Sequence, residues 1–170
     1  MSLTIINHKN HKIDNDLSLK LENAFNLIRK EENLGDCSVN LKIVDNEEME
    51  DLNKKYRNKD ASTNVLSFTN KDVSKKFTNE LGDIAISYEY VIEESGALNK
   101  EYDDHIIHML IHGIYHILGF DHENDNMAKT MEDKEIALLS KLKITQLPRT
   151  SSIFLHFIFK LQKNILFSNY

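Results

Sequence analysis

Cysteine and glycine are scarce in this chain of 170 residues, and each scarcity excludes or restricts a structural feature. The only cysteine is Cys37, so the chain cannot form an internal disulfide. Within the stretch CSVNLKIV, Cys37, Val39 and Leu41 alternate onto one face of a predicted strand, so we expect Cys37 to pack in the core. The glycines number five, so a glycine inside a helical pattern requires a reason.

Long apolar runs and a positive net charge are also missing. No apolar stretch reaches the length of a membrane-spanning helix, and the opening MSLTIINHKNHK lacks the basic-then-apolar order of a signal peptide. The net charge of −6 does not indicate nucleic-acid binding by the surface as a whole, so an RNA substrate would need a local basic patch. We expect a single-domain, soluble, cytoplasmic protein without stable membrane insertion.

Hydrophobic periodicity predicts four strands and about five helices. The strands are expected at residues 3–7, 37–45, 63–68 and 81–87. The helices are expected at residues 16–33, 46–59, 88–95, 100–119 and 124–143. Asp16 or Ser18 is the expected N-cap of the first helix. Because the two kinds of element do not alternate strictly, we predict an α+β fold in one domain, with a small mixed four-stranded sheet covered by the helices.

The stretch HGIYHILGFDH, residues 112–122, carries three histidines. His112 and His116 are four residues apart, so on a helix they share a face. Gly119 favours the left-handed conformation that ends helices, and the turn would bring His122 back toward the other two. Three imidazoles around one point leave a fourth position open, which is typical of catalytic zinc. We predict one Zn²⁺ on this trio, although Ni²⁺ or another transition ion would also suit three imidazoles.

Position 113 separates this motif from that of a protease. The spacing H-x-x-x-H-x-x-G-x-x-H is the metzincin arrangement, whose helix carries a glutamate after the first histidine as the base that activates water. This chain has Gly113 there, and glycine cannot transfer a proton. The sequence therefore predicts a zincin-like metal helix without the protease base, which disfavours a peptidase.

Three blocks of the sequence are informative when they are read together: LNKKYRNKDASTNVLSF at residues 52–68, LGDIAIS at 81–87 and HMLIHGIYHILGFDH at 108–122. Their order and wording resemble the YbeY family of bacterial endoribonucleases and rRNA maturation factors. The resemblance covers roughly residues 1–143. Members of the family typically carry H-G-x-x-H-x-x-G-[YF]-D-H, in which Gly113 is the family's own residue. One departure is Asn64, where the family usually has aspartate.

The resemblance implies a single-strand-specific, metal-dependent endoribonuclease that acts in 16S rRNA 3′-end maturation and ribosome quality control. It implies rRNA and ribosomal subunits as partners. It also implies that His112, His116 and His122 are the metal ligands and that His112 and Arg57 belong to the catalytic site. The alternative is a non-catalytic ribosome-assembly or RNA-binding factor whose metal is structural.

Arg57 lies in the densest basic cluster before the histidine helix. Phosphodiester cleavage needs the charge of the phosphate to be neutralised, and the planar fork of arginine suits a phosphate better than an ammonium group does. Tyr56 beside it could stack on a base. For Arg57 we favour a functional role, which rests mostly on the resemblance. For the neighbouring lysines we favour a solvated helix end: Lys54, Lys55 and Lys59.

His108, Asp121 and Asp83 are candidates for supporting the metal ligands or contacting the substrate. His108 lies one turn before His112 on the same stripe. Asp121 could orient a ligand imidazole, move a proton or simply form the turn, and Asp83 has the same ambiguity. His105 is expected at the surface. The sequence singles out no residue as general base.

The chain is expected to divide into an endoribonuclease domain at residues 1–147 and an accessory tail at residues 148–170. The tail begins at Pro148, the only proline, and has no acidic residue. Its apolar run IFLHFIF is too short to cross a bilayer. We expect the tail to rest on the domain or to meet a partner, and to contribute nothing to the metal site.

Overall fold

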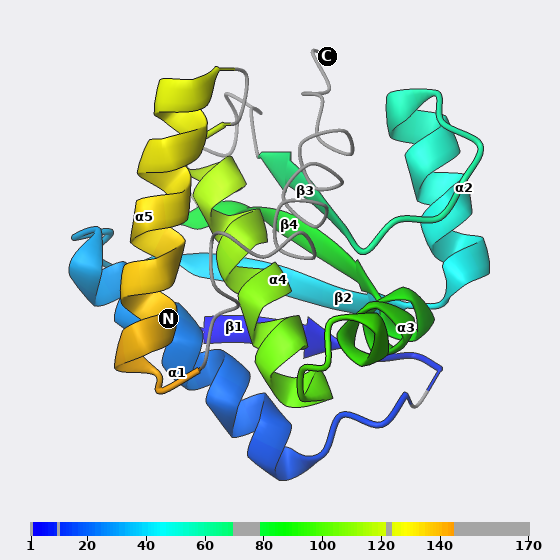
Figure 1. Cartoon of the computed structure of the whole chain (residues 1–170), viewed down its shortest axis with the longest axis horizontal. Coiled ribbons are helices and arrows are strands. Elements are labelled where there is room, and N and C mark those ends of the chain that lie inside the picture. The colour runs from blue at the N-terminus through cyan, green and yellow to red at the C-terminus, as the bar shows by residue number, and fades with distance from the viewer. Residues whose placement is uncertain (1, 10, 70–78, 122–123, 145–170) are drawn as a thin grey trace.

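The computed structural model describes residues 2–9, 11–69, 79–121 and 124–144 (Figure 1). Within these ranges it contains four strands and five helices, and the predicted α+β class is confirmed. The elements follow one another as β1 (Ser2–Ile6), α1 (Asn15–Glu31), β2 (Ser38–Val44), α2 (Asn46–Arg57), β3 (Val65–Thr69), β4 (Glu80–Ser87), α3 (Tyr88–Ala97), α4 (Tyr102–Ile117) and α5 (Asp125–Lys141). The predicted tail at 148–170 lies outside the described residues.

The sheet is mixed, as predicted. Its strand order is β1-β2-β4-β3. β1 pairs with β2 and β2 with β4 in parallel, whereas β3 runs antiparallel to β4, with Val65 opposite Ile86 and Thr69 opposite Gly82. This order leaves β3 beside β4 at one edge, where it can meet both α2 and α4.

α4 is the central helix of the molecule. It lies over one face of the sheet, flanked by α1 and α5 on one side and by α3 on the other (Figure 1). Every residue of α4 from His105 to Ile117 is buried. No helix in the described part of the chain is long and apolar enough to cross a membrane.

The opposite face of the sheet carries α2. Met49 of α2 packs there with Val44, Leu66 and Ala85 from three different strands. Alternation along the strands explains the two faces, because neighbours such as Ile43 and Ile84 belong to the main core under α4. Cys37 is also part of that main core, as predicted.

The helix ends follow local capping chemistry. The predicted caps of α1, Asp16 and Ser18, were wrong, because the helix begins earlier and the carboxylate of Asp14 accepts from the Leu17 amide at 2.8 Å. Asp45 caps α2 in the same way, accepting from the Glu48 amide at 2.9 Å. Acidic residues in the first turn of α2 and basic ones in its last turn match the helix dipole.

Gly113 brings α4 close to the sheet. A Cβ built at this position would lie 3.0 Å from Ile84 Cδ1 and 3.2 Å from Ser67 Oγ. Position 113 therefore faces β4 and β3, and a side chain there would push the helix outward. The glycine has a packing reason that is separate from the absence of a protease base.

Substitution of Gly113 by valine tests this contact. Gly113→Val should lower the free energy of unfolding by about 1–3 kcal/mol, since its methyl groups would overlap Ile84 and Ser67. Denaturant titration followed by circular dichroism measures the change. Gly96 in α3 is the matched control, because a Cβ there meets nothing within 4 Å. Gly96→Ala should raise stability by up to about 1 kcal/mol, and equal losses at both positions would contradict the packing account.

Candidate metal centre

His112 and His116 face one another from successive turns of α4. Both side chains are buried, and their Nε2 atoms are 3.1 Å apart. Two bare ring nitrogens would repel at this distance, so a proton or a metal ion has to lie between them. Two imidazoles on one tetrahedral zinc, each bound at about 2.0–2.1 Å, would place their nitrogens about 3.3 Å apart. The pair therefore has the spacing of two ligands of one metal ion.

Glu135 of α5 contacts the ring nitrogen of His112 that faces away from His116. Its Oε1 lies 2.6 Å from His112 Nδ1, and its Oε2 lies 3.3 Å from His108 Nε2. An ionised carboxylate only accepts hydrogen bonds, so the two ring nitrogens that face it carry the protons. When His112 is neutral, its Nε2 is consequently bare and faces His116.

Burial and hydrogen bonding set the charges around this carboxylate. Burial lowers the pKa of His108 to about 4, and the hydrogen bond to Glu135 only partly offsets it, so His108 is neutral at pH 7. Burial alone would raise the pKa of Glu135. The electrostatic attraction of His112 and the hydrogen bonds from His108 and His112 outweigh it and hold that pKa below its ordinary value. Glu135 is therefore an ionised acceptor between two imidazoles.

Gly119 ends α4 as predicted. Its φ is +91°, its amide donates to the carbonyl of His116 at 3.0 Å, and the amide of Phe120 donates to that of Tyr115 at 3.0 Å. This is the Schellman arrangement, and the ring contact of 5.3 Å between Tyr115 and Phe120 is its usual apolar partner. The chain is thus turned sharply just after the second histidine.

The third predicted ligand, His122, lies outside the described residues. In residues 2–9, 11–69, 79–121 and 124–144, no group of three or more histidine, cysteine or acidic side chains is placed to hold a metal ion. Asp121 is buried at 5% exposure at the end of the turn. The structure thus brings two of the three predicted ligands together, and the trio stays a prediction.

Arg57 ends α2, and its side chain is partly buried. Its Nε and Nη2 are buried and have no hydrogen-bond partner in the part of the chain that the structure describes. Burial lowers its pKa to about 10, which leaves the group positively charged at neutral pH. A buried cation of this kind is destabilised until an anion meets it. Arg57 therefore differs from the exposed cations at the same helix end, such as Lys54 and Lys55.

β3 connects the arginine end of α2 to the histidine helix. The ring of Tyr56, which is 38% exposed, lies 4.9 Å from that of Phe68 in β3. Ser67, one residue earlier in β3, is the neighbour of Gly113 in α4. In Figure 1 the C-terminal ends of α2 and α4 lie toward the same edge of the molecule, with β3 between them. Lys54 forms an exposed ion pair with Asp60 at 2.9 Å, which is typical of a solvated helix end.

Asp83 is separated from the histidines by the sheet. Its neighbour Ile84 contacts α4, so alternation along β4 turns Asp83 to the other face. There it is exposed, and its Oδ1 accepts from the side-chain Nδ2 of Asn40 at 2.9 Å. The structure does not bring Asp83 to the metal centre.

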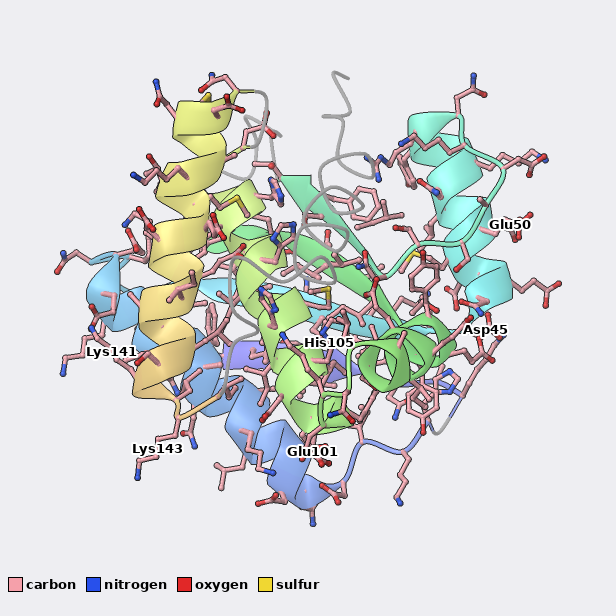
Figure 2. The ribbon with its side chains drawn as sticks, viewed as in Figure 1. Asp45, Glu50, Glu101, His105, Lys141 and Lys143 are labelled. Carbon is pink, nitrogen blue, oxygen red and sulfur yellow. The ribbon has the colours of Figure 1, made fainter. Side chains whose placement is uncertain are left out.

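The prediction that His105 lies at the surface was wrong. The side chain is fully buried between α4 and α3 (Figure 2), and its Nε2 lies 2.9 Å from Glu94 Oε2. Asn64 donates to the same oxygen at 3.0 Å. An aspartate at position 64 would set a second carboxylate against Glu94, so the amide suits this chain. The error arose because α3 covers a stripe of α4 that local periodicity marks as polar.

Glu135 and Glu94 are the buried carboxylates that the sequence analysis missed. A signal for Glu135 was present, because it lies four residues after Met131 and three before Leu138, on the apolar face of α5. A charged residue on such a face requires a buried partner. For Glu94, which contacts Asn64 just before β3 and His105 of α4, the short helix α3 offered no comparable pattern.

Comparison with known proteins gives one consistent family. Residues 4–143 match the family described as endoribonuclease YbeY. The endoribonuclease YbeY of Francisella philomiragia is 40% identical, with 85% of this chain and 92% of the relative covered. That of Francisella tularensis subsp. novicida is 38% identical, with 85% and 90% covered.

A solved structure agrees with this match. The solution structure of TM1509 from Thermotoga maritima is similar with a TM-score of 0.60 and 28% identity, covering 83% of this chain and 89% of that one. The resemblance drawn from the three sequence blocks is confirmed by both the family match and the relatives. The chain belongs to the YbeY family of endoribonucleases.

Proposed function

We propose that this chain cleaves single-stranded RNA with the help of one metal ion held by His112, His116 and His122. The observation that carries the proposal is the pair of Nε2 atoms of His112 and His116, 3.1 Å apart in a chain of an endoribonuclease family. The turn at Gly119 supports it, because the backbone reverses just before the third histidine. Zinc suits three imidazoles, and nickel is the alternative that the same ligands accept.

The residues of the site divide the work of phosphodiester hydrolysis. A metal ion bound there would supply positive charge and lower the pKa of a bound water. His112 contributes a bare Nε2 while its Nδ1 proton is held by Glu135. Arg57 contributes a positive charge, and its Nε and Nη2, which lack a hydrogen-bond partner in the described residues, are the groups that we assign to a phosphate oxygen. The exposed ring of Tyr56 beside it offers a surface on which a base can stack.

The proposed cellular role is an extension from the family to which the chain belongs. The names of the relatives support an endoribonuclease, and a non-catalytic assembly factor is not favoured by them. We extend the proposal to maturation of the 16S rRNA 3′ end and to ribosome quality control, with rRNA and ribosomal subunits as partners. The catalytic unit is residues 1–147, and residues 148–170 are an accessory segment.

A cleavage assay on labelled single-stranded RNA tests the proposed function. Zinc-loaded protein should cleave, chelator-treated protein should not, and restored metal should return activity to the wild type but not to His112→Ala. His8→Ala is the matched control, because His8 is an exposed histidine far along the chain from the motif. Wild-type rates from chelated protein or from His112→Ala would refute the metal mechanism. Binding of RNA without cleavage by the loaded protein would support the assembly-factor alternative.

Arg57 should contribute to cleavage without contributing to stability. Arg57→Met should lower kcat/KM on RNA by about 10²–10³, as loss of a transition-state charge partner does. Its free energy of unfolding should be unchanged or higher, because the buried charge is removed while the apolar stem is kept. Metal content should stay at the wild-type level.

Two further variants separate charge from geometry at this position. Arg57→Lys should recover only part of the activity, because the bidentate fork is lost. Lys55→Met is the control in the same cluster, since Lys55 is exposed and lies 5.0 Å from the Tyr56 ring centroid. Full activity in Arg57→Met would contradict the catalytic role and leave Arg57 as an ordinary cation at a solvated helix end.

A further inference from the structure

We infer that Glu135 is the positioning residue of the metal centre, fixing the tautomer and ring orientation of His112 so that Nε2 is presented to the metal. The inference rests on the proposed function, because it presumes that His112 is a ligand. Glu135 itself is not a ligand in this scheme. It acts through the imidazole that it holds.

The contacts of Glu135 have the geometry of an orienting group. The carboxylate is 3% exposed, and its Oε1 lies 2.6 Å from Nδ1 of His112. The opposite nitrogen of the same ring, Nε2, lies 3.1 Å from His116 Nε2. One nitrogen of His112 is therefore bound by an acceptor that cannot donate, and the other faces the second predicted ligand.

Tautomer control is the chemical consequence. A neutral imidazole carries its proton on either nitrogen, and only the bare nitrogen can bind a metal ion. The carboxylate holds the proton at Nδ1 of His112. The ring therefore already has the tautomer that binds metal through Nε2, and metal binding does not have to shift the tautomer equilibrium. Hydrogen bonding to a carboxylate also makes the ligating nitrogen more basic, and such outer partners change metal affinity by about 10- to 100-fold.

His108 holds the carboxylate in its turn. Its Nε2 lies 3.3 Å from Oε2, the oxygen that does not contact His112. Both oxygens of Glu135 are thus engaged by rings one helical turn apart on α4, which limits rotation of the carboxylate. Because this nitrogen of His108 is directed at Glu135, the structure gives His108 the role of an anchor for the carboxylate.

The residue beside Glu135 fixes α5 to the rest of the domain. Lys134 Nζ lies 2.8 and 2.9 Å from the two carboxylate oxygens of Glu32, just beyond the end of α1. The hydroxyl of Tyr115 in α4 donates to the same glutamate at 3.1 Å. This cluster joins α1, α4 and α5 one residue from Glu135. The carboxylate is therefore carried by a helix whose position on α4 is set independently of the metal.

Zinc affinity of Glu135→Gln, measured by competition with a chromophoric chelator, tests the inference. The substitution keeps the shape and removes the charge, and the zinc dissociation constant should rise at least about 10-fold. Glu94→Gln is the matched control, because Glu94 is also buried and also contacts a histidine of α4, His105, at 2.9 Å. Glu94→Gln should lose stability but keep the wild-type dissociation constant. Equal dissociation constants in the wild type and Glu135→Gln would overturn the inference.

Nitrogen-15 NMR of metal-free wild-type protein provides a measurement that needs no substitution at Glu135. At a pH above the usual histidine range, about 8, His112 should show a protonated Nδ1 and a bare Nε2. A protonated Nε2 on His112 would overturn the inference even if Glu135→Gln failed to fold.

Failure of this inference is distinguishable from failure of the proposed function. If His112→Ala retains stoichiometric zinc, the proposed metal site itself is wrong. If His112→Ala loses zinc while Glu135→Gln binds as tightly as the wild type, the metal site stands and only the positioning role falls.

Discussion

The pairing of histidines inside the protein is the constraint on which the site depends. α4 is enclosed by the sheet, α1, α3 and α5, and it carries His105, His108, His112 and His116 in buried positions. Buried polar groups are costly unless they are hydrogen-bonded. Glu94 from α3 and Glu135 from α5 meet three of these rings. The arrangement that results directs one nitrogen each of His112 and His116 at a shared point.

Strand β3 is contacted both by α4, which carries the histidines, and by the end of α2 that carries Arg57. Gly113 lets the histidine helix approach Ser67 of β3, and Phe68 of the same strand contacts the aromatic ring beside Arg57. Two nitrogens of the Arg57 guanidinium, Nε and Nη2, are buried without a hydrogen-bond partner in the described residues, which costs stability. α2 and α4 thus lie on opposite faces of one small sheet, and each contacts its edge strand β3.

Local sequence pattern predicted much of the fold and only part of the site. The strands, the helices and the helix end at Gly119 follow from periodicity and backbone preference, which act over a few residues. The contacts of Glu135 and Glu94 join residues far apart in the chain, so no local pattern predicts their partners. The position of His105 was predicted wrongly for the same reason. From sequence alone Asp83 is a candidate for the metal centre, because a predicted strand does not show which of its faces α4 will cover. Asn64, noted as a departure from the family, acquired its physical meaning only beside Glu94.

X-ray absorption at the zinc edge of the metal-loaded full chain tests the central claim most directly, because it reports the ligands themselves, His122 included. The account predicts three imidazole nitrogens at about 2.0–2.1 Å in the wild type and one imidazole fewer in His122→Ala. A coordination sphere with fewer than three imidazoles in the wild type, or one that is unchanged in His122→Ala, would contradict it.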